Sequence, residues 1–255
     1  MPITFNSILQ SVDIDPSTVR LLRHQDSRSM RGKKPYQLWR DNRPAFELYQ
    51  SVQGFDGKPK LASAKYWASF LAMPNGETLF AGLYAVASGE VLETQMVDPS
   101  TGTLLLPGTR NSYTLHLAAS LTDLIGKLVI DWGSGTRAWV QYADRQNKVI
   151  LELRRAFTEP SFPGFDQFIE PLSRIESLPS SWLEALRSTS GVYLLTCPRT
   201  KELYVGSASG IDGFLGRFMG YATNNHGGNI ALIGRDPSDF QVSILETAGS
   251  SATVE

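Results

Sequence analysis

The chain has 255 residues, of which 42% are hydrophobic, and it carries a formal net charge of −1 at pH 7. This length and apolar content are enough for a sizeable buried core and predict two domains of ordinary size. No apolar run approaches the roughly 20 residues of a membrane-spanning helix, and Asp13 and Asp15 stand where a secretory signal would carry positive charge. Cys197 is the single cysteine, which excludes a disulfide framework and a cysteine-rich zinc site. We therefore expect a cytoplasmic protein without a membrane partner, in which any metal ion is held by oxygen atoms or histidine.

The segment from Arg20 to Arg43 is strongly basic. It holds eight arginines and lysines against Asp26 and Asp41, so the rest of the chain is acidic. A basic stretch of this density is typical of proteins that neutralise DNA phosphates, and it is equally typical of a solvated basic loop. Its centre supplies the DNA-binding candidates Arg28, Arg31, Lys33 and Lys34.

The first part of the chain is predicted to be mixed and then rich in β-strands. We expect helices over residues 4–12 and 15–22, the second beginning at Asp15 and Pro16, because aspartate caps backbone N–H groups and proline fits the first helical position. Short β-type runs separated by turn sequences follow, at residues 66–70, 78–86, 90–97, 112–118, 127–132, 137–142 and 148–153. Their spacing predicts a small barrel or sandwich within an α+β protein.

The sequence EPSFPG at residues 159–164 indicates a break between two structural units, because it combines prolines with a glycine. We expect residues 1–160 to form a DNA-recognition domain with a barrel-like core and residues 161–187 to form a linker with a connecting helix. That helix is predicted over residues 179–186, with a serine at its start and Glu184 in its first turn. Residues 188–255 then form the second domain.

The second domain is predicted to begin with a β-hairpin. Residues 191–195 and 203–207 are β-rich and are joined by a polar turn. In such a hairpin we expect Tyr193 and Tyr204 to face each other across the two strands.

A helix and a glycine-rich loop are predicted to follow the hairpin. The helix covers residues 213–222 and places Arg217 and Tyr221 on one face, because they are four positions apart. The loop reads HGGN and begins at His226, and its adjacent glycines let the backbone approach a partner closely. A last β-run is expected over residues 240–245.

The GVY and YVG elements of the hairpin, the helical arginine with an aromatic residue one turn later, and the HGGN loop occur in an order and spacing that resemble the GIY-YIG nuclease family. The resemblance covers residues 188–255. It implies a small α/β domain, built from a β-hairpin and helices, that hydrolyses the phosphodiester bonds of DNA with Mg²⁺ or Mn²⁺.

The resemblance also implies roles for single residues. Tyr193 and Tyr204 are the pair from which a general base comes, and we favour Tyr193 slightly; this role requires a hydroxyl pKa far below the usual value of about 10. Arg217 would hold the scissile phosphate, ideally through two parallel N–H bonds. The remaining candidates are Tyr221 and His226, which would orient water or contact phosphate, and Asn229, which would fix the loop. Taken singly, such residues are more often core tyrosines, surface arginines and solvated loop histidines.

The family places its metal-binding glutamate in a helix after the last strand. Ser250 or Ser251 would cap that helix, so the family position is expected about a turn or more beyond Glu255. Within the sequence, Glu255 is the candidate metal ligand and Glu246 is the weaker one. A chain that lacks the ligand would cut DNA weakly or not at all, because Mg²⁺ is held by at least one carboxylate.

The leading hypothesis is a restriction-type endonuclease that acts on double-stranded DNA and whose first domain selects a sequence or a modified base. Basic and aromatic residues alternate in that domain, and an aromatic cage in a small barrel could take up a flipped base. The aromatic residues concerned are Tyr36, Trp39, Phe46, Tyr49, Phe55, Tyr66, Trp67 and Phe70. The same residues are typical of a hydrophobic core, and this reading is favoured for Trp67, Phe70 and Phe80.

Two other hypotheses stay open. The first is a noncatalytic DNA-binding protein with a degenerate or truncated nuclease module. The second is a homing or repair nuclease. Ser207 stands where the repair members of the family carry a basic residue after YIG, which disfavours a repair role.

Overall fold

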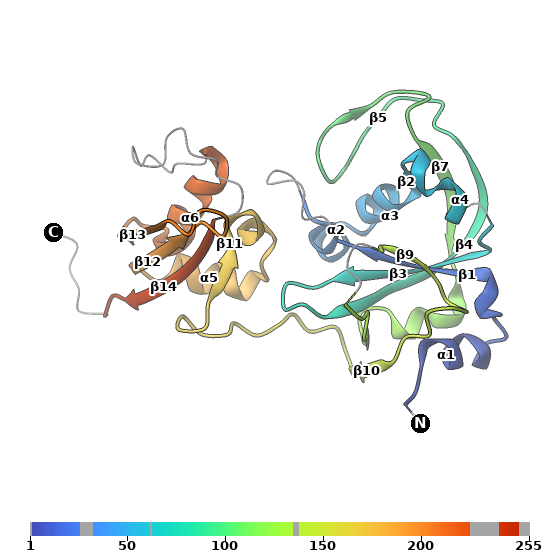
Figure 1. Ribbon diagram of the computed structural model, residues 1–255, viewed down its shortest axis with the longest axis horizontal. Helices are drawn as coiled ribbons and strands as arrows, with labels where there is room; N and C mark the ends of the chain where they lie inside the picture. The colour runs from blue at the N-terminus through green and yellow to red at the C-terminus, as the bar shows by residue number, and fades with distance from the viewer. Residues whose placement is uncertain (1, 26–32, 62, 135–137, 225–239, 250–255) are drawn as a thin grey trace. The chain divides into compact units, whose positions relative to one another are not determined.

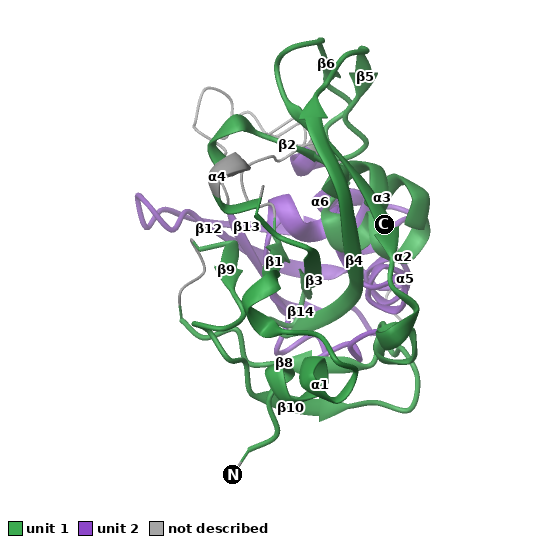
Figure 2. Cartoon of the chain, turned by 90° about the vertical axis from the view of Figure 1, so that its right-hand side faces the viewer, with its two compact units in different colours: residues 1–26, 32–158 green, residues 27–31, 159–255 purple. Residues whose placement is uncertain are grey.

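A computed structural model describes residues 2–25, 33–61, 63–134, 138–224 and 240–249. These residues form two compact units, shown in green and purple in Figure 2; unit 1 ends at Thr158 and unit 2 continues from Glu159. Both units combine helices and strands, so the predicted α+β class is confirmed at this coarse level. Within the described residues, no helix combines the length and the apolar composition required to cross a lipid bilayer.

Unit 1 is dominated by strands, with helices on its flanks (Figure 1). Its helices and 3₁₀ turns are α1 (Phe5–Ser11), η1 (Pro16–Thr18), α2 (Pro35–Asp41), α3 (Arg43–Ser51), η2 (Phe55–Gly57), α4 (Lys58–Leu61) and η3 (Ala119–Leu124). Its strands are β1 (Val19–His24), β2 (Val52–Gln53), β3 (Tyr66–Ala72), β4 (Thr78–Val91), β5 (Met96–Val97), β6 (Leu104–Leu105), β7 (Asn111–Leu117), β8 (Leu128–Ile130), β9 (Val140–Tyr142) and β10 (Ile150–Leu153). Each predicted β-run therefore contains a strand.

The main sheet of unit 1 curls into a half-barrel (Figure 1), which is the form that the predicted barrel or sandwich takes. Its strand order is β10-β8-β4-β3-β1-β9, and β7 pairs with both β4 and β2. Strands β1 and β3 run parallel. The pairing shifts register between Ser69 and Phe70 and again between Val86 and Ser88. Such bulges bend a strand and increase its twist, which accounts for the curl.

The helix predicted over residues 15–22 is wrong. The expected cap is present, since the Asp15 carboxylate accepts a hydrogen bond of 2.9 Å from the Ser17 backbone N–H, but only the single turn η1 follows it. From Val19 the chain is extended, and all six side chains of β1 are buried. Because β1 is paired with β3 on one side and β9 on the other, it needs strand geometry rather than a helix.

Most aromatic residues proposed for a base-binding cage fill the core instead. Tyr36, Trp39, Phe46, Trp67 and Phe70 are each at most 4% exposed, and Phe80 is fully buried. Tyr49 and Tyr66 are partly buried, and only Phe55 among the eight is exposed. The interpretation of these side chains as core residues is therefore confirmed for Trp67, Phe70 and Phe80.

The basic segment from Arg20 to Arg43 is not one solvated surface. Arg20 and Arg23 are buried, and their guanidinium groups donate hydrogen bonds to oxygen atoms of unit 1. Lys33 is exposed and Lys34 is half-buried. The other two DNA-binding candidates, Arg28 and Arg31, lie outside the described residues. Part of the predicted positive charge is thus used inside the fold.

His24 gives unit 1 a pH-dependent stability. Its side chain is buried in β1 between the rings of Phe46 and Tyr49, and burial lowers the pKa of His24 from 6.5 to about 4. Because the folded pKa lies below the unfolded one, folding favours the neutral imidazole. The shift contributes about 3 kcal/mol to the free energy of unfolding. This stabilisation is fully present above about pH 6.5 and is lost as the pH falls toward 4.

We expect the free energy of unfolding of wild type to fall over this pH range more steeply than that of His24→Gln. Urea unfolding from pH 7.5 to 4.5 gives the free energy of unfolding of both proteins. The titration of the other groups is common to both and cancels when the two curves are subtracted. His116→Gln is the matched control, since His116 is exposed on β7. Parallel curves for wild type and His24→Gln would show that the imidazole does not titrate with folding.

Unit 2 contains an antiparallel sheet with the order β11-β14-β12-β13, and its helices pack against one face. Its elements are β11 (Ile169–Pro171), η4 (Leu172–Ser177), α5 (Ser180–Arg187), β12 (Gly191–Thr196), β13 (Leu203–Ala208), α6 (Gly213–Asn224) and β14 (Gln241–Thr247). The predicted hairpin, both predicted helices and the last strand are present.

Residues 161–187, for which a linker was predicted, are instead built into unit 2. Strand β11 pairs with β14, so this segment supplies one strand of the sheet. Phe168, Leu172 and Trp182 belong to the same hydrophobic cluster as the side chains of β12 and α6. Their burial in a shared core is the physical reason why this segment is not a linker.

Candidate active site

Three polar side chains of unit 2 meet at one hydroxyl group. Tyr193 lies on β12 and is fully buried. Its hydroxyl oxygen accepts a hydrogen bond from Nε of Arg217 at 3.0 Å and lies 2.8 Å from the hydroxyl oxygen of Tyr221. Arg217 and Tyr221 are one turn apart on α6, so a single helix face brings both to the strand. The structure thus brings together three of the six predicted catalytic residues.

A glycine makes room for the Tyr193 hydroxyl. Gly206 on β13 is the cross-strand partner of Tyr193, and a Cβ atom at Gly206 would overlap the Tyr193 hydroxyl oxygen. Opposite residues of an antiparallel pair lie on the same face of a sheet, so the ring of Tyr193 extends over the bare backbone of its partner. The glycine of the YVG element is therefore required by the position of the tyrosine in the GVY element, a relation that the sequence alone did not reveal.

Aromatic side chains fix the ring of Tyr193 in place. Phe218, on the buried side of α6, meets it edge to face with the ring centroids 5.3 Å apart. The ring of Tyr221 lies 6.1 Å away at 71°, and the guanidinium carbon of Arg217 lies 5.0 Å from the centroid of Tyr221. Phe218 was not predicted as a site residue, although its place one position after Arg217 puts it next to the same helix face.

The electrostatics keep the Tyr221 hydroxyl protonated. The pKa of Tyr221 is raised to about 12, first because burial disfavours the phenolate and then because of the adjacent Tyr193 hydroxyl. The hydrogen bond to Tyr193 is the main cause that raises the pKa of Arg217 above its usual value. At neutral pH, Tyr221 is therefore a phenol and Arg217 a cation. Both can donate to the oxygen of Tyr193 and stabilise a negative charge there.

Tyr204 does not face Tyr193 as predicted. In the hairpin register Tyr204 is opposite Leu195, and the partner of Tyr193 is Gly206. The two tyrosines share one face of the sheet, but they are diagonal neighbours. Tyr204 is partly buried against the hydrophobic cluster of unit 2, and its hydroxyl makes no hydrogen bond within the described part of the chain. The length of the turn sets this register, so Tyr193 is opposite Gly206 whereas Tyr204 is opposite Leu195.

The remaining predicted site residues do not complete the site. His226, Asn229 and Glu255 lie outside the described residues. Glu246, the weaker metal candidate, is opposite Val192, whose neighbour Tyr193 points to the other face of the sheet. In addition, no three His, Cys, Asp or Glu side chains of residues 2–25, 33–61, 63–134, 138–224 and 240–249 form a metal-binding group. The side chains hydrogen-bonded to Tyr193 are those of an arginine and a tyrosine, whereas Mg²⁺ is held by carboxylates.

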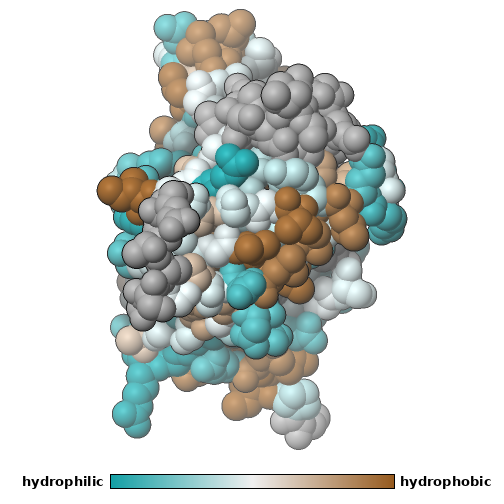
Figure 3. Space-filling model, turned by 90° about the vertical axis from the view of Figure 1, so that its left-hand side faces the viewer, coloured by the Kyte–Doolittle hydropathy of each residue, from teal (hydrophilic) through white to brown (hydrophobic). Residues whose placement is uncertain are grey.

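The outer face of the sheet is apolar. Ile169, Ser243, Leu194 and Val205 form a row across its four strands. Figure 3 views the molecule from the left of Figure 1 and shows hydrophobic side chains, in brown, gathered on that face. Among the described residues of unit 2, the exposed large hydrophobic side chains are those of Ile169, Leu203, Val205, Ile211 and Leu245.

Comparisons of the chain with protein-family models, with curated proteins and with solved structures found no match. The case for a function depends on the chemistry of the site itself. Its defining feature is a buried tyrosine hydroxyl that accepts a hydrogen bond from an arginine and shares another with a second tyrosine.

Proposed function

We propose that the protein is a DNA endonuclease in which unit 2 hydrolyses phosphodiester bonds. The observation that carries this proposal is the convergence of Arg217 and Tyr221 on the hydroxyl of Tyr193. All three residues belong to the ordered set of motifs on which the resemblance to the GIY-YIG family rests. A purely structural tyrosine would not require a cation and a second phenol at the same oxygen.

The site has the groups that phosphodiester hydrolysis needs. A water molecule must lose a proton as its oxygen attacks phosphorus, and the charge that develops on the phosphate must be neutralised. As a phenolate, Tyr193 would accept the proton of that water and return to the phenol, while the bond between phosphorus and the leaving oxygen breaks and that oxygen takes a proton from solvent. Arg217 would stabilise the phenolate through Nε and the phosphate through its other N–H groups, since a guanidinium has five donors. Tyr221 would stay protonated throughout.

The family resemblance implies Mg²⁺ or Mn²⁺, which would supply further positive charge at the phosphate. Since the described side chains around Tyr193 include no suitable carboxylate, the ion would depend on a ligand outside the described residues. Glu255 stays the candidate for that ligand.

Exchanging Tyr193 for phenylalanine tests the assignment of the base. We expect Tyr193→Phe to lower the rate of DNA cleavage about 100-fold or more, since general-base catalysis contributes about 10²–10⁴-fold. Tyr204→Phe is the matched control, because Tyr204 lies on the same face but is opposite Leu195 rather than at the Tyr193 hydroxyl, and it should retain most of the activity. Cleavage of plasmid DNA with Mg²⁺ or Mn²⁺ measures both rates, in this chain and in any longer natural form that contains it. Equal rates for the two variants would refute the proposed base.

Unit 1 is proposed to select the DNA site, by sequence or by base modification, and to bind double-stranded DNA. The exposed Lys33 and the half-buried Lys34 support this part of the proposal, together with Arg28 and Arg31 of the same segment. The function would then be that of a restriction-type endonuclease.

Changing Arg28, Arg31, Lys33 and Lys34 together to glutamine should flatten the salt dependence of DNA binding. Each lost phosphate contact removes about 0.9 from the slope of log affinity against log salt concentration. Fluorescence anisotropy of a labelled duplex, between 50 and 300 mM salt, gives the slope for the full chain. Replacing the exposed Lys65 and Arg110 of unit 1 is the control and should leave the slope unchanged. An unaltered slope in the fourfold variant would mean that this segment does not touch phosphate.

The lack of a described carboxylate beside Tyr193 favours one alternative, a noncatalytic DNA-binding protein with a degenerate nuclease module. This alternative predicts tight binding of duplex DNA without cleavage under any metal condition. It also predicts that Tyr193→Phe leaves every measurable activity unchanged.

A further inference from the structure

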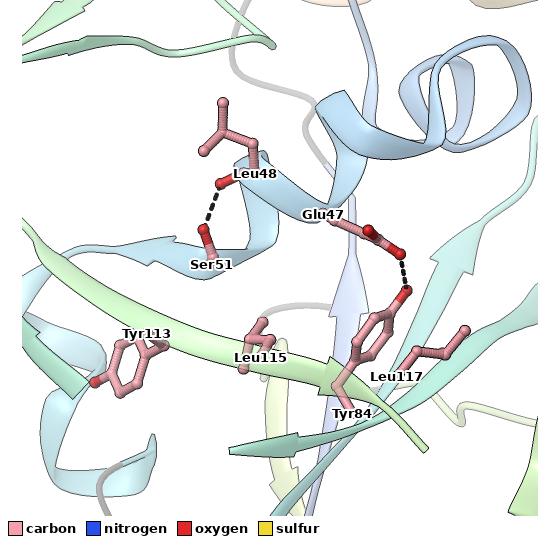
Figure 4. A pocket seen from close by; sticks show the side chains of 7 residues that line it. All are labelled: Glu47, Leu48, Ser51, Tyr84, Tyr113, Leu115 and Leu117. Carbon is pink, nitrogen blue, oxygen red and sulfur yellow. Dashed lines mark hydrogen bonds between the residues drawn. The ribbon is translucent and has the colours of Figure 1, made fainter. Parts of the chain in front are cut away.

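A cavity of about 300 Å³ lies in unit 1 between helix α3 and the curled sheet (Figure 4). Its lining residues are Glu47, Leu48 and Ser51 from α3, Tyr84 from β4, and Tyr113, Leu115 and Leu117 from β7. The Asn42 side chain caps the start of helix α3 by accepting a hydrogen bond from the Ala45 backbone N–H at 3.1 Å. The cavity is at the lower end of the size range of small-molecule sites, about 300–1,000 Å³.

The polar part of this cavity is a carboxylate beside a phenol. Glu47 is half-buried, and one of its oxygen atoms lies 3.5 Å from the Tyr84 hydroxyl (Figure 4). Burial, assisted by the charge of Glu47, raises the pKa of Tyr84 to about 12, so this hydroxyl stays protonated and donates. Arg43, one helical turn earlier, lies over Trp39 and donates to the Ala81 carbonyl oxygen. Glu47 forms no ion pair within the described residues.

The carboxylate of Glu47 therefore retains capacity to accept hydrogen bonds. An ionised carboxyl group has about four lone-pair sites, and the long contact with Tyr84 uses one of them. The rest of the wall consists of aliphatic side chains, the ring of Tyr113 and Ser51, whose hydroxyl donates to the Leu48 carbonyl oxygen; Leu48 and Leu117 are exposed. A ligand that fits must be small, have apolar faces and present N–H groups. Glu47 is the charged residue that lines the cavity, and the nearby cation Arg43 interacts electrostatically with both Glu47 and Tyr84.

We propose that this cavity binds a single nucleobase that carries an exocyclic amino group, with Glu47 accepting its N–H hydrogen bonds. The identification of the ligand rests on the proposed action on DNA, in which unit 1 selects the site. Cytosine, adenine and guanine have such an amino group, and carboxylates accept hydrogen bonds from the amino group of cytosine. Thymine has none, and its single ring N–H lies between two carbonyl oxygens that the carboxylate would repel. The phosphates would stay outside, and the base would enter by extrusion from the duplex.

The first test titrates the full chain with deoxycytidine, deoxyadenosine, deoxyguanosine and thymidine, followed by changes in ¹⁵N–¹H NMR signals. At least one amino-bearing nucleoside should bind roughly 10-fold or more tightly than thymidine, given about 1–3 kcal/mol of discrimination for a good bidentate contact. Glu47→Gln should abolish this preference. Glu90→Gln changes an exposed carboxylate of β4 and is the matched control. Equal binding of all four nucleosides, or no binding, would overturn the proposal.

Leu117→Trp provides a second variant, because Leu117 lies at the exposed rim and a larger side chain there fills the cavity without entering the core. It should abolish nucleoside binding while its circular dichroism spectrum matches that of wild type. Unchanged binding in this variant would place the nucleoside elsewhere.

The second test uses a duplex with one 2-aminopurine, whose fluorescence rises when the base leaves the stack, in the presence of EDTA so that no cleavage occurs. Wild type should increase the signal and Leu117→Trp should not. Nucleoside binding without DNA cleavage would reject the nuclease and leave the base pocket standing. DNA cleavage without nucleoside binding and without a fluorescence increase would reject the base pocket and leave the nuclease proposal standing.

Discussion

Arg217→Ala is expected to reduce DNA cleavage by about 100-fold or more while DNA affinity stays nearly unchanged. The guanidinium would stabilise charge that develops on the phosphate and on the Tyr193 oxygen during the reaction, so its loss raises the barrier more than it weakens binding. In the structure Arg217 is half-buried and donates from Nε to Tyr193 at 3.0 Å, which orients the group before DNA arrives. Single-turnover cleavage and duplex binding, measured on the same preparation, separate the two effects.

Two companion variants make this result specific. Arg217→Lys keeps the positive charge but loses the planar fork, so it should recover only a small part of the rate. Arg187→Ala removes an exposed arginine of α5 that pairs with Glu184, and it should cut like wild type. If Arg217→Ala cleaves DNA at nearly the wild-type rate, the assignment of Arg217 to the reaction is wrong.

Gly206→Ala is expected to destabilise unit 2 by about 1–2 kcal/mol. The added Cβ would overlap the Tyr193 hydroxyl, and the ring cannot swing away because Phe218 and Tyr221 enclose it. Overpacking costs about 1–3 kcal/mol, offset in part by the smaller entropy of the unfolded alanine variant. For a unit of this size the midpoint of thermal unfolding should fall by roughly 5–10 °C.

Gly210→Ala is the matched control, because no atom lies within 4 Å of a Cβ at that position. Scanning calorimetry of the full chain follows the transition of each unit. Gly206→Ala should shift only the transition of unit 2, which is identified by the fact that Tyr193→Phe shifts it as well. Gly210→Ala should shift neither transition. Equal midpoints for the two glycine variants would contradict the close fit between Gly206 and Tyr193.

The elements that the sequence predicted well are those fixed by local pattern. The β-runs, the hairpin at residues 191–208 and the helix carrying Arg217 follow from alternation, turn residues and helical spacing. Strand β1 was predicted as the end of a helix, because its strand geometry depends on pairing with β3 and β9, which are distant in sequence. The burial of Arg20 and Arg23 was also not predicted, because it depends on packing against residues that are distant in sequence.

The site was predictable where it depends on spacing along one element. Arg217 and Tyr221 were placed on one helix face by their separation of four positions, and both meet Tyr193. The positions of Gly206 and Tyr204 relative to Tyr193 depend on the register of the hairpin, and a shift in pairing would exchange them. In unit 1, Glu47 and Tyr84 meet only because α3 lies over β4, and neither was singled out from the sequence.

The position of β1 between β3 and β9 also governs how unit 1 reaches its fold. Leu21 pairs with Gln141, near the other end of the unit, so the half-barrel cannot be completed until most of this unit has left the ribosome. Closing so long a loop costs entropy before its contacts form, which makes folding slow and raises its cooperativity. Unit 2 follows the same rule on a smaller scale, because β14 must enter between β11 and β12. In both units, therefore, a late-synthesised strand completes the sheet, and nascent chains that stop short of it expose unpaired strand edges to aggregation and proteolysis.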